Sequence, residues 1–304
     1  MIMSEPIKLK NCLLAEAIGD ICGSPWEFAP YKQLTLDGLK ESLEFKYLTN
    51  QTMSFKDTPL YKNFTPGIGR LPHPPFATDD TICTFAIAEA VINNTDIQNN
   101  LVKRCKQHID IGYGEMFVRW LLSPVQRPYN SFGNGSAMRC SIAGWYYDTY
   151  NDVVDAATRT AAPTHNNIEG IKGAVETAKA IFRGRKGWTK EDIADAILEQ
   201  YPEKWLHTDW SEILETYKFD VTCQGSMPVV AMALRDSNSY EDCLLRCIQS
   251  GGDADTLCAI AGPIAYSVYR EIPEWMIAVA DYYLPQWCKD VNEQYNKLLG
   301  FCDY

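Results

Sequence analysis

Two short acidic segments carry the residues best suited to chemistry. Thr78-Asp79-Asp80-Thr81 and Gly251-Gly252-Asp253-Ala254-Asp255-Thr256 each lead into an apolar, Ala-rich stretch. Each segment should therefore lie where a polar turn begins a helix. Carboxylates gathered at buried helix ends repel one another and resist desolvation unless a shared cation balances them. The structural alternative is a pair of N-caps, because Asp and Thr are common cap residues that the helix dipole favours.

A metal site with two ions is the chemical interpretation of these segments. Consecutive side chains at a helix start point in different directions, so Asp79 and Asp80 should reach different ions, or one ion and one water. Asp253, Asp255 and Thr256 should converge on one side of their helix. Oxygen donors without His or Cys select Mg²⁺ or Mn²⁺ over zinc or copper. If the interpretation holds, the four carboxylates converge, with roughly 4 Å between the two ions.

Four further features are compatible with a site, and three of them have structural explanations. From its spacing alone, Glu27 fits a solvated charge after a helix that ends in Gly and Pro, and His165 fits a capping or surface residue in a turn. Asp20 fits a hydrogen-bond partner inside a helical bundle. The small-residue loop around residues 133–136 precedes an apolar stretch, which is a pattern typical of an anion cradle. A Ser/His/Asp nucleophilic site has little support, because no Ser stands in a nucleophile-elbow context.

The elements that position these residues are predicted to be helices. Apolar residues recur at helical spacing in residues 13–21 and 168–182, and further helices are expected after Thr189 and Pro273. Leu43, Phe45 and Tyr47 alternate as in one short strand, which cannot form a sheet alone. We therefore expect an all-α fold with a single domain over residues 1–304. The Pro-rich segment 28–77 is too long for a simple connection and is predicted to be a lid or loop insertion.

Composition excludes several function classes. The 304 residues carry a net charge of -11, which opposes binding to a phosphate backbone. The eleven Cys are dispersed, which indicates reduced thiols in a reducing compartment, and Cys243 and Cys247 lack a second pair at zinc spacing. No basic leader and no uncharged apolar run of about 18 residues is present. We expect a soluble cytoplasmic protein without nucleic-acid or membrane partners.

Five motifs in order resemble the ADP-ribosylglycohydrolase family, which includes the dinitrogenase reductase-activating glycohydrolase and the ADP-ribosylarginine hydrolases. They are Gly-Asp-x-x-Gly-x-Pro-x-Glu from residue 19, Thr-Asp-Asp-Thr from 78, Gly-Asn-Gly-Ser-Ala-Met-Arg from 133, Thr-His at 164, and Gly-Gly-Asp-x-Asp-Thr from 251. The resemblance covers roughly residues 11 to 270. It implies an all-helical, single-domain hydrolase with two Mg²⁺ or Mn²⁺ ions that removes ADP-ribose from modified side chains.

The resemblance also implies roles for individual residues. Thr78, Asp79, Asp80, Asp253, Asp255 and Thr256 would bind the metals, and Glu27 would lie near the metals and the substrate ribose. Gly133, Asn134, Gly135 and Ser136 would hold the diphosphate and its neighbouring ribose, and His165 would line the cleft. Asp80 or Asp255 would accept a proton from the attacking water, while Glu27 would hold the diol or a water. The chain departs from the family pattern at Cys258, where Gly is common, and this raises the question of how the helix packs there.

The expected activity is therefore hydrolysis of the bond between ADP-ribose and a modified side chain of a protein, or a small conjugate. Arginine-linked ADP-ribose is the preferred substrate, with serine-linked or polymeric ADP-ribose as the alternative. A metal-dependent phosphohydrolase of nucleotides or sugar phosphates would use the same ligands. A non-catalytic ADP-ribose-binding protein is disfavoured, because none of the acidic ligands is missing.

Overall fold

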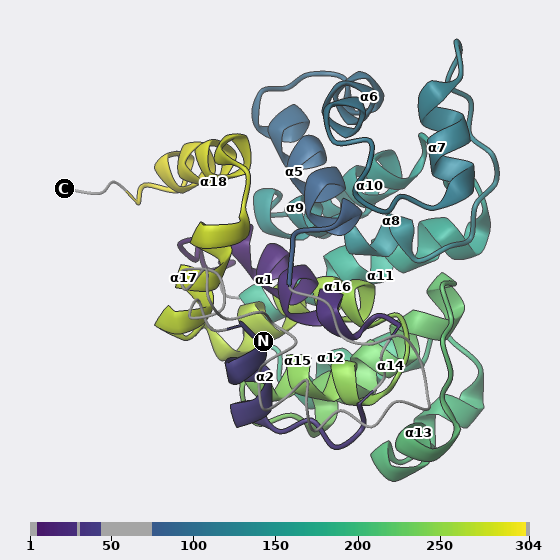
Figure 1. The fold of residues 1–304 in the computed structure, drawn as a ribbon, viewed down its shortest axis with the longest axis vertical. Helices are drawn as coiled ribbons and strands as arrows, with labels where there is room; N and C mark the ends of the chain where they lie inside the picture. Colours follow the sequence, from purple (N-terminus) through teal and green to yellow (C-terminus); the bar gives the residue numbers. More distant parts are fainter. Residues whose placement is uncertain (1–4, 29–30, 44–74, 302–304) are drawn as a thin grey trace, which may run out of the picture.

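The computed structural model describes residues 5–28, 31–43 and 75–301 (Figure 1). Within these ranges the chain forms sixteen α-helices, two short 3₁₀ helices and no strand, which confirms the predicted all-α fold. The α-helices are α1 (Leu14–Gly23), α2 (Leu36–Leu43), α5 (Asp79–Ile92), α6 (Ile97–Gln107), α7 (Glu115–Leu122), α8 (Gly135–Met138), α9 (Ser141–Tyr146), α10 (Tyr150–Ala161), α11 (Ile168–Arg185), α12 (Lys190–Leu198), α13 (Trp210–Thr216), α14 (Cys223–Asp236), α15 (Tyr240–Gln249), α16 (Ala254–Tyr269), α17 (Glu274–Tyr283) and α18 (Gln286–Leu298).

Helices α1 and α16 form the centre of the molecule, where Figure 1 shows them side by side. Every residue of α1 is buried, so this helix is covered on all sides. A Cβ on Gly19 would lie 2.1 Å from the Cys258 carbonyl oxygen, and one on Gly23 would lie 2.3 Å from that of Ala254. At the other end of the pair, a Cβ on Gly262 would lie 2.2 Å from the Ala15 oxygen. The two helices are therefore antiparallel, and small residues allow their backbones to touch.

This packing answers the question that Cys258 raised. Its thiol donates to the Leu244 carbonyl oxygen of α15 at 3.4 Å, so the side chain faces α15 and not α1. The close approach of α16 to α1 depends on Gly19 of α1, which has no side chain to collide with the Cys258 carbonyl group. A larger residue at position 258 is therefore compatible with a tight α1–α16 contact.

Side-chain caps fix where several of the surrounding helices begin. Thr189 accepts from the Asp192 backbone N–H at the start of α12, as its sequence context predicts. Asn167 caps α11 and Thr222 caps α14 in the same way. Helices α11, α14 and α15 then pack against α16, while α5 packs against α1. These contacts fix the positions of α1 and α16, whose ends carry candidate site residues.

Some sequence predictions fall at the edge of what the structure describes. Leu43 is the last residue of α2, while Phe45 and Tyr47 lie outside the described residues, as does most of the predicted lid 28–77.

The ten cysteines within the described ranges are buried free thiols. None of the helices in these ranges has both the length and the apolar character that a membrane span requires.

Candidate active site

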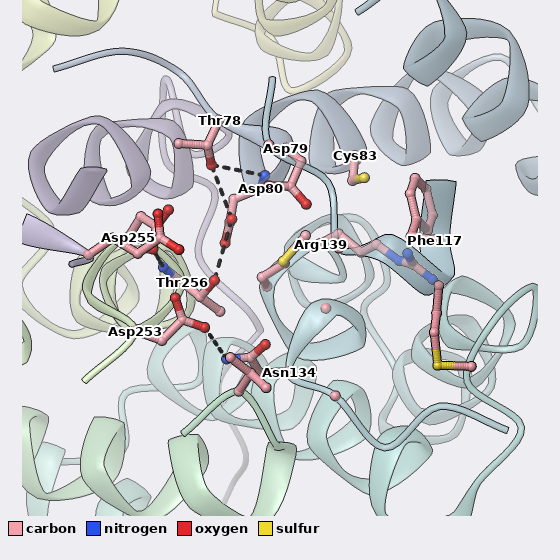
Figure 2. Close-up of a pocket in the computed structure, with 18 of the residues that line it drawn as sticks. Thr78, Asp79, Asp80, Cys83, Phe117, Asn134, Arg139, Asp253, Asp255 and Thr256 are labelled. Carbon is pink, nitrogen blue, oxygen red and sulfur yellow. Dashed lines mark hydrogen bonds between the residues drawn. The ribbon is translucent and has the colours of Figure 1, made fainter. Parts of the chain in front are cut away.

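One large cavity, with a volume of about 660 Å³, opens beside the ends of α1, α5 and α16. It is of the size that holds small-molecule ligands. Figure 2 shows the aspartates of α5 and α16 at one end and Arg139 beside Phe117 at the other. Six acidic side chains but no Lys and only one Arg are among the described residues that line it. An anionic ligand would therefore need added positive charge at the acidic end.

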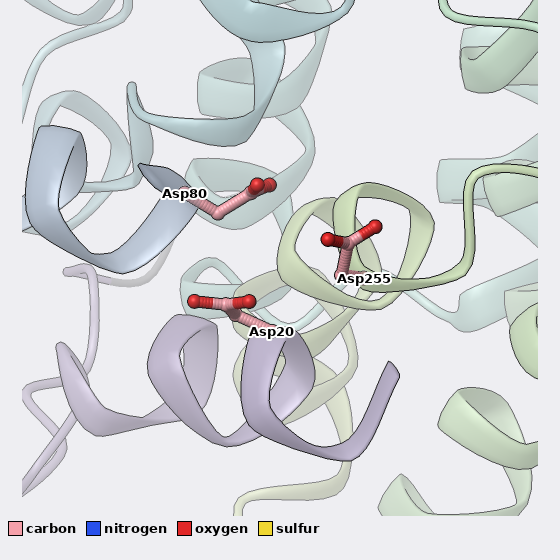
Figure 3. A group of neighbouring side chains, drawn as sticks. All are labelled: Asp20, Asp80 and Asp255. Atoms are coloured by element: carbon pink, nitrogen blue, oxygen red, sulfur yellow. The ribbon is translucent and has the colours of Figure 1, made fainter. Parts of the chain in front are cut away.

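Three helices bring the first group of carboxylates together. Asp20 of α1, Asp80 of α5 and Asp255 of α16 each place one carboxylate oxygen within 4.8 Å of the others. Figure 3 shows the three side chains directed toward one another. All three residues are buried. Asp80 and Asp255, one from each acidic segment, thus lie together in this group.

A second group lies next to the first and shares one member with it. Glu27, Asp253 and Asp255 also place carboxylate oxygens within 4.8 Å of one another. Glu27 is half-buried at the rim, whereas Asp253 and Asp255 are buried. Asp255 thus belongs to both groups. Two adjacent groups of three carboxylates that share one residue match the donor arrangement of a two-ion site.

Hydrogen bonds hold the first group in position. The backbone N–H and the hydroxyl of Thr78 both donate to the Asp20 carboxylate, each at 2.8 Å, and the Thr81 backbone N–H donates to it at 3.2 Å. The Thr256 hydroxyl donates to Asp80 Oδ2 at 3.4 Å. These contacts tie α1, α5 and α16 together at the cavity.

The N-cap explanation is correct for one of the two segments. Thr78 accepts from the Asp80 backbone N–H and so caps α5. Asp253 occupies the N-cap position of α16 but makes no capping hydrogen bond. Its Oδ2 instead accepts from Asn134 Nδ2 at 2.8 Å. Asp79 lines the cavity half-buried, and it belongs to neither carboxylate group.

The electrostatics of the cluster fit a divalent cation. Burial raises the pKa of Asp80 and Asp255 well above the usual range, and repulsion from neighbouring carboxylates adds to the effect. Burial likewise raises the pKa of Asp20 to about 6 and that of Asp79 to about 7. Asp80 Oδ1 is buried without a hydrogen-bond partner. An oxygen-only donor set with an unpartnered buried oxygen suits Mg²⁺ or Mn²⁺, which would remove the repulsion.

The glycine-rich segment after residue 132 forms one wall of the cavity. Gly133, Asn134 and Gly135 line it, together with His165. The segment is held by an isolated antiparallel bridge between Gly133 and Thr222, in which Asn134 N–H donates to the Val221 oxygen at 2.8 Å. Ser136 lies apart from this wall. It is fully buried, and its hydroxyl donates to the Gly170 oxygen at 2.6 Å.

Sequence reasoning missed several residues at this site. Asp20 is the hydrogen-bond partner inside the bundle that the sequence predicted, since it accepts from Thr78 and Thr81, but its place in a carboxylate group was not predicted. Gly112 and Gly114, at the N-terminal end of α7, line the cavity, and the Gly-x-Gly pattern before an apolar run was the available signal. No role was predicted for Arg139, the last residue of the motif that begins at Gly133. This arginine is 1% exposed, lines the cavity and stacks on Phe117 with 5.8 Å to the ring centroid.

Comparisons with known proteins identify relatives over most of the chain. An uncharacterised protein of Archaeoglobus fulgidus is 22% identical over 90% of this chain and 92% of its own length. Human ADP-ribosylhydrolase ARH3 is 23% identical over 88% of this chain and 87% of its own. The mouse ADP-ribosylhydrolase ARH3 is 22% identical over 88% and 85%, respectively.

A solved structure described as an ADP-ribosylglycohydrolase-related protein complex has a similar fold. It superposes with a TM-score of 0.66 at 21% sequence identity and covers 96% of both chains. The sequence profile of the ADP-ribosylglycohydrolase family matches residues 5–300. That match spans nearly the whole chain and includes every residue of both carboxylate groups. This protein is a member of the ADP-ribosylglycohydrolase family.

Proposed function

We propose that this protein is a divalent-metal-dependent hydrolase that releases ADP-ribose from ADP-ribosylated proteins or small ADP-ribose conjugates. One observation carries the proposal: the two carboxylate groups that share Asp255 at one end of a cavity large enough for a nucleotide-sized ligand. Asp20, Asp80 and Asp255 would hold one ion, and Glu27, Asp253 and Asp255 the other. Thr78, Asp79 and Thr256 would complete the shells directly or through water.

The chemistry follows from the position of the carboxylates. Bound divalent cations would supply positive charge and a grip on the ribose diol. Hydrolysis breaks the bond between the anomeric carbon and the acceptor atom, and the oxygen of water takes the acceptor's place. Buried carboxylates stabilise the positive charge that develops on the sugar in such a reaction. The leaving acceptor takes up a proton.

Asp80 is the first candidate for the residue that accepts the proton of the attacking water, because its Oδ1 is buried without a partner. Asp255 is the alternative, since it belongs to both carboxylate groups. Glu27 is half-buried and lines the same acidic end of the cavity. We assign it to holding the sugar hydroxyls or a water.

The rest of the cavity offers donors for the diphosphate. Gly133, Asn134 and Gly135 would form one wall, with His165 behind them and the Gly135 backbone N–H as the candidate donor, because the N–H groups of Gly133 and Asn134 already donate to Ser131 Oγ and the Val221 oxygen. The N-terminal end of α7 brings Gly112 and Gly114 to the same space, and helix N-termini favour anions. The role of Ser136 would be indirect, because its hydroxyl is bonded to Gly170 away from the cavity.

The acceptor linkage is a finer part of the proposal. Arginine-linked ADP-ribose is favoured because six acidic side chains and no Lys are among the described residues that line the cavity, which suits a cationic guanidinium. Serine-linked or polymeric ADP-ribose is the alternative. Cleavage of those conjugates without cleavage of the arginine conjugate would reject the preference but keep the class of reaction.

The test uses arginine-linked, serine-linked and polymeric ADP-ribose with Mg²⁺ or Mn²⁺, and products are separated by chromatography. We expect intact ADP-ribose that depends on the cation. A phosphohydrolase, the second candidate that these ligands allow, would release inorganic phosphate instead. Asp255→Asn should abolish the release, whereas Asp195→Asn on the exposed face of α12 should not. No ADP-ribose from any conjugate, or equal rates for both variants, would refute the proposal.

A further inference from the structure

A chain of buried polar groups connects Arg139 with the glycine-rich wall of the cavity. Arg139 Nη2 donates to Thr164 Oγ1 at 2.6 Å. Thr164 Oγ1 lies 2.7 Å from His165 Nδ1. Arg139 is 1% exposed, Thr164 0% and His165 3%. Buried polar groups are almost always hydrogen-bonded, so the direction of each hydrogen bond matters.

The donor inventory fixes the first of these directions and favours the second. Arginine can only donate, so Thr164 Oγ1 must accept from it. When Thr164 donates its single hydroxyl hydrogen to His165 Nδ1, that nitrogen is the unprotonated one and the ring proton sits on Nε2. Burial, with the Arg139 charge as the next cause, lowers the pKa of His165 to about 2, so the ring is neutral.

The other end of the ring faces the glycine-rich segment. A Cβ on Gly133 would lie 3.8 Å from Nε2, so this nitrogen stands beside the Gly133 backbone, whose carbonyl can accept from Nε2–H. The Gly133 backbone N–H is engaged elsewhere, with Ser131 Oγ at 3.2 Å. Both ring nitrogens thus have complementary partners in one tautomer.

Thr164 also holds the approach to this segment through its backbone. Its carbonyl oxygen accepts from the Tyr129 and Ser131 backbone N–H groups at 3.4 and 3.3 Å. Directly after Gly133, Asn134 donates to Asp253 Oδ2 in the second carboxylate group. The chain of contacts from Arg139 therefore ends at the acidic side of the cavity.

We propose that Arg139 and Thr164 are positioning residues that lock His165 as an Nε2–H donor and thereby hold the Gly133–Asn134 segment in its ligand-binding shape. His165 then acts as a neutral hydrogen-bond donor and takes no part in acid–base catalysis. The consequence for ligand binding rests on the proposed function, whereas the tautomer is a property of the protein alone.

The tautomer is measured by long-range ¹H–¹⁵N NMR on the full chain. The sequence has only four His, and His165→Gln identifies the signal of interest. We expect a protonated Nε2 and an unprotonated Nδ1 at neutral pH. A proton on Nδ1, or a doubly protonated ring, would overturn the proposal irrespective of any activity.

The functional arm compares three variants for ADP-ribose binding by calorimetry with Mg²⁺ present. Thr164→Val removes the relay and should weaken binding about tenfold, the factor expected for one lost hydrogen bond. Thr164→Ser keeps the hydroxyl and should restore near-wild-type affinity.

Thr160→Val is the matched control. Thr160 is also fully buried, but its hydroxyl donates only to the Ala157 oxygen within α10. Equal affinities for Thr164→Val and Thr160→Val would overturn the positioning role. If Thr164→Val fails to fold, Thr164→Ser decides: a changed ring tautomer in a variant that keeps the hydroxyl contradicts the relay. Absence of ADP-ribose binding in the wild type would instead count against the proposed function and leave the NMR result standing.

Discussion

The contact between α1 and α16 predicts that Gly23→Ala damages the site more than the fold. The added Cβ would lie 2.3 Å from the Ala254 oxygen and 2.5 Å from Asp255 Cα. Because ordinary contacts of this kind begin near 3.4 Å, the two backbones must separate by about 1 Å where α16 begins. That separation displaces Asp255, the residue common to both carboxylate groups. Misplacement of a reacting group by about 1 Å can reduce a rate on the order of a hundredfold.

Gly262→Ala is the matched control for this prediction. Its Cβ would lie 2.2 Å from the Ala15 oxygen, so it overpacks the same helix pair to a similar degree, two helical turns away from Asp255. Overpacking costs about 1–3 kcal/mol, partly offset by about 1 kcal/mol from replacing a helical Gly with Ala. Both variants should therefore lose similar, modest stability.

The assay combines thermal unfolding with ADP-ribose release at a temperature where both variants remain folded. We expect similar falls in Tm, with a loss of activity of at least tenfold for Gly23→Ala and near-wild-type activity for Gly262→Ala. Equal activity in the two variants would show that the approach of α1 to α16 does not position Asp255, and would refute the reasoning.

Three further predictions follow from individual side chains. His165 stays neutral in the folded state, with a pKa lowered to about 2 from 6.5, so stability is complete above pH 6.5 and falls on acidification by up to about 1.4 kcal/mol per pH unit. Urea unfolding from pH 6.5 to 4 should show a shallower fall for His165→Gln. The raised pKa values of Asp20 and Asp79, about 6 and 7, mean that metal-free stability declines as pH rises from about 4 through 7. Mg²⁺ should therefore raise the Tm more at pH 8 than at pH 5, and a larger shift at pH 5 would contradict this. Ser136→Ala removes the bond to Gly170 and the weaker contact with Cys223 Sγ, so it should cost about 1 kcal/mol of stability and leave the KM unchanged, as steady-state kinetics would reveal.

The sequence was most informative where local patterns determine structure. Helical periodicity and cap residues such as Thr189 predicted the all-α fold, because a helix start depends on a few neighbouring residues. The two acidic segments were also found from local composition. Their partnership through Asp80 and Asp255 agrees with the geometry, since both carboxylates belong to one buried group.

The features of the site that the sequence did not predict depend on contacts between residues distant in sequence. Asp20 meets Asp255 because Gly19 and Gly23 bring α1 against α16, and that contact pairs residues more than 200 positions apart. The direction of the Ser136 hydroxyl toward Gly170 likewise follows from the packing of α8 on α11, which no motif records. The hydrogen-bonded series from Arg139 through Thr164 to His165 depends on burial and on the packing of separate segments, which no local sequence pattern records.

The central claim is that two divalent ions lie at the acidic end of the cavity, with Asp255 as their common ligand. Anomalous scattering from crystals grown with Mn²⁺ tests it most directly. The account predicts two peaks about 4 Å apart, one beside Asp20 and Asp80, the other beside Glu27 and Asp253, with Asp255 in contact with both. A cavity without peaks, or a single ion that Asp255 does not touch, would contradict it.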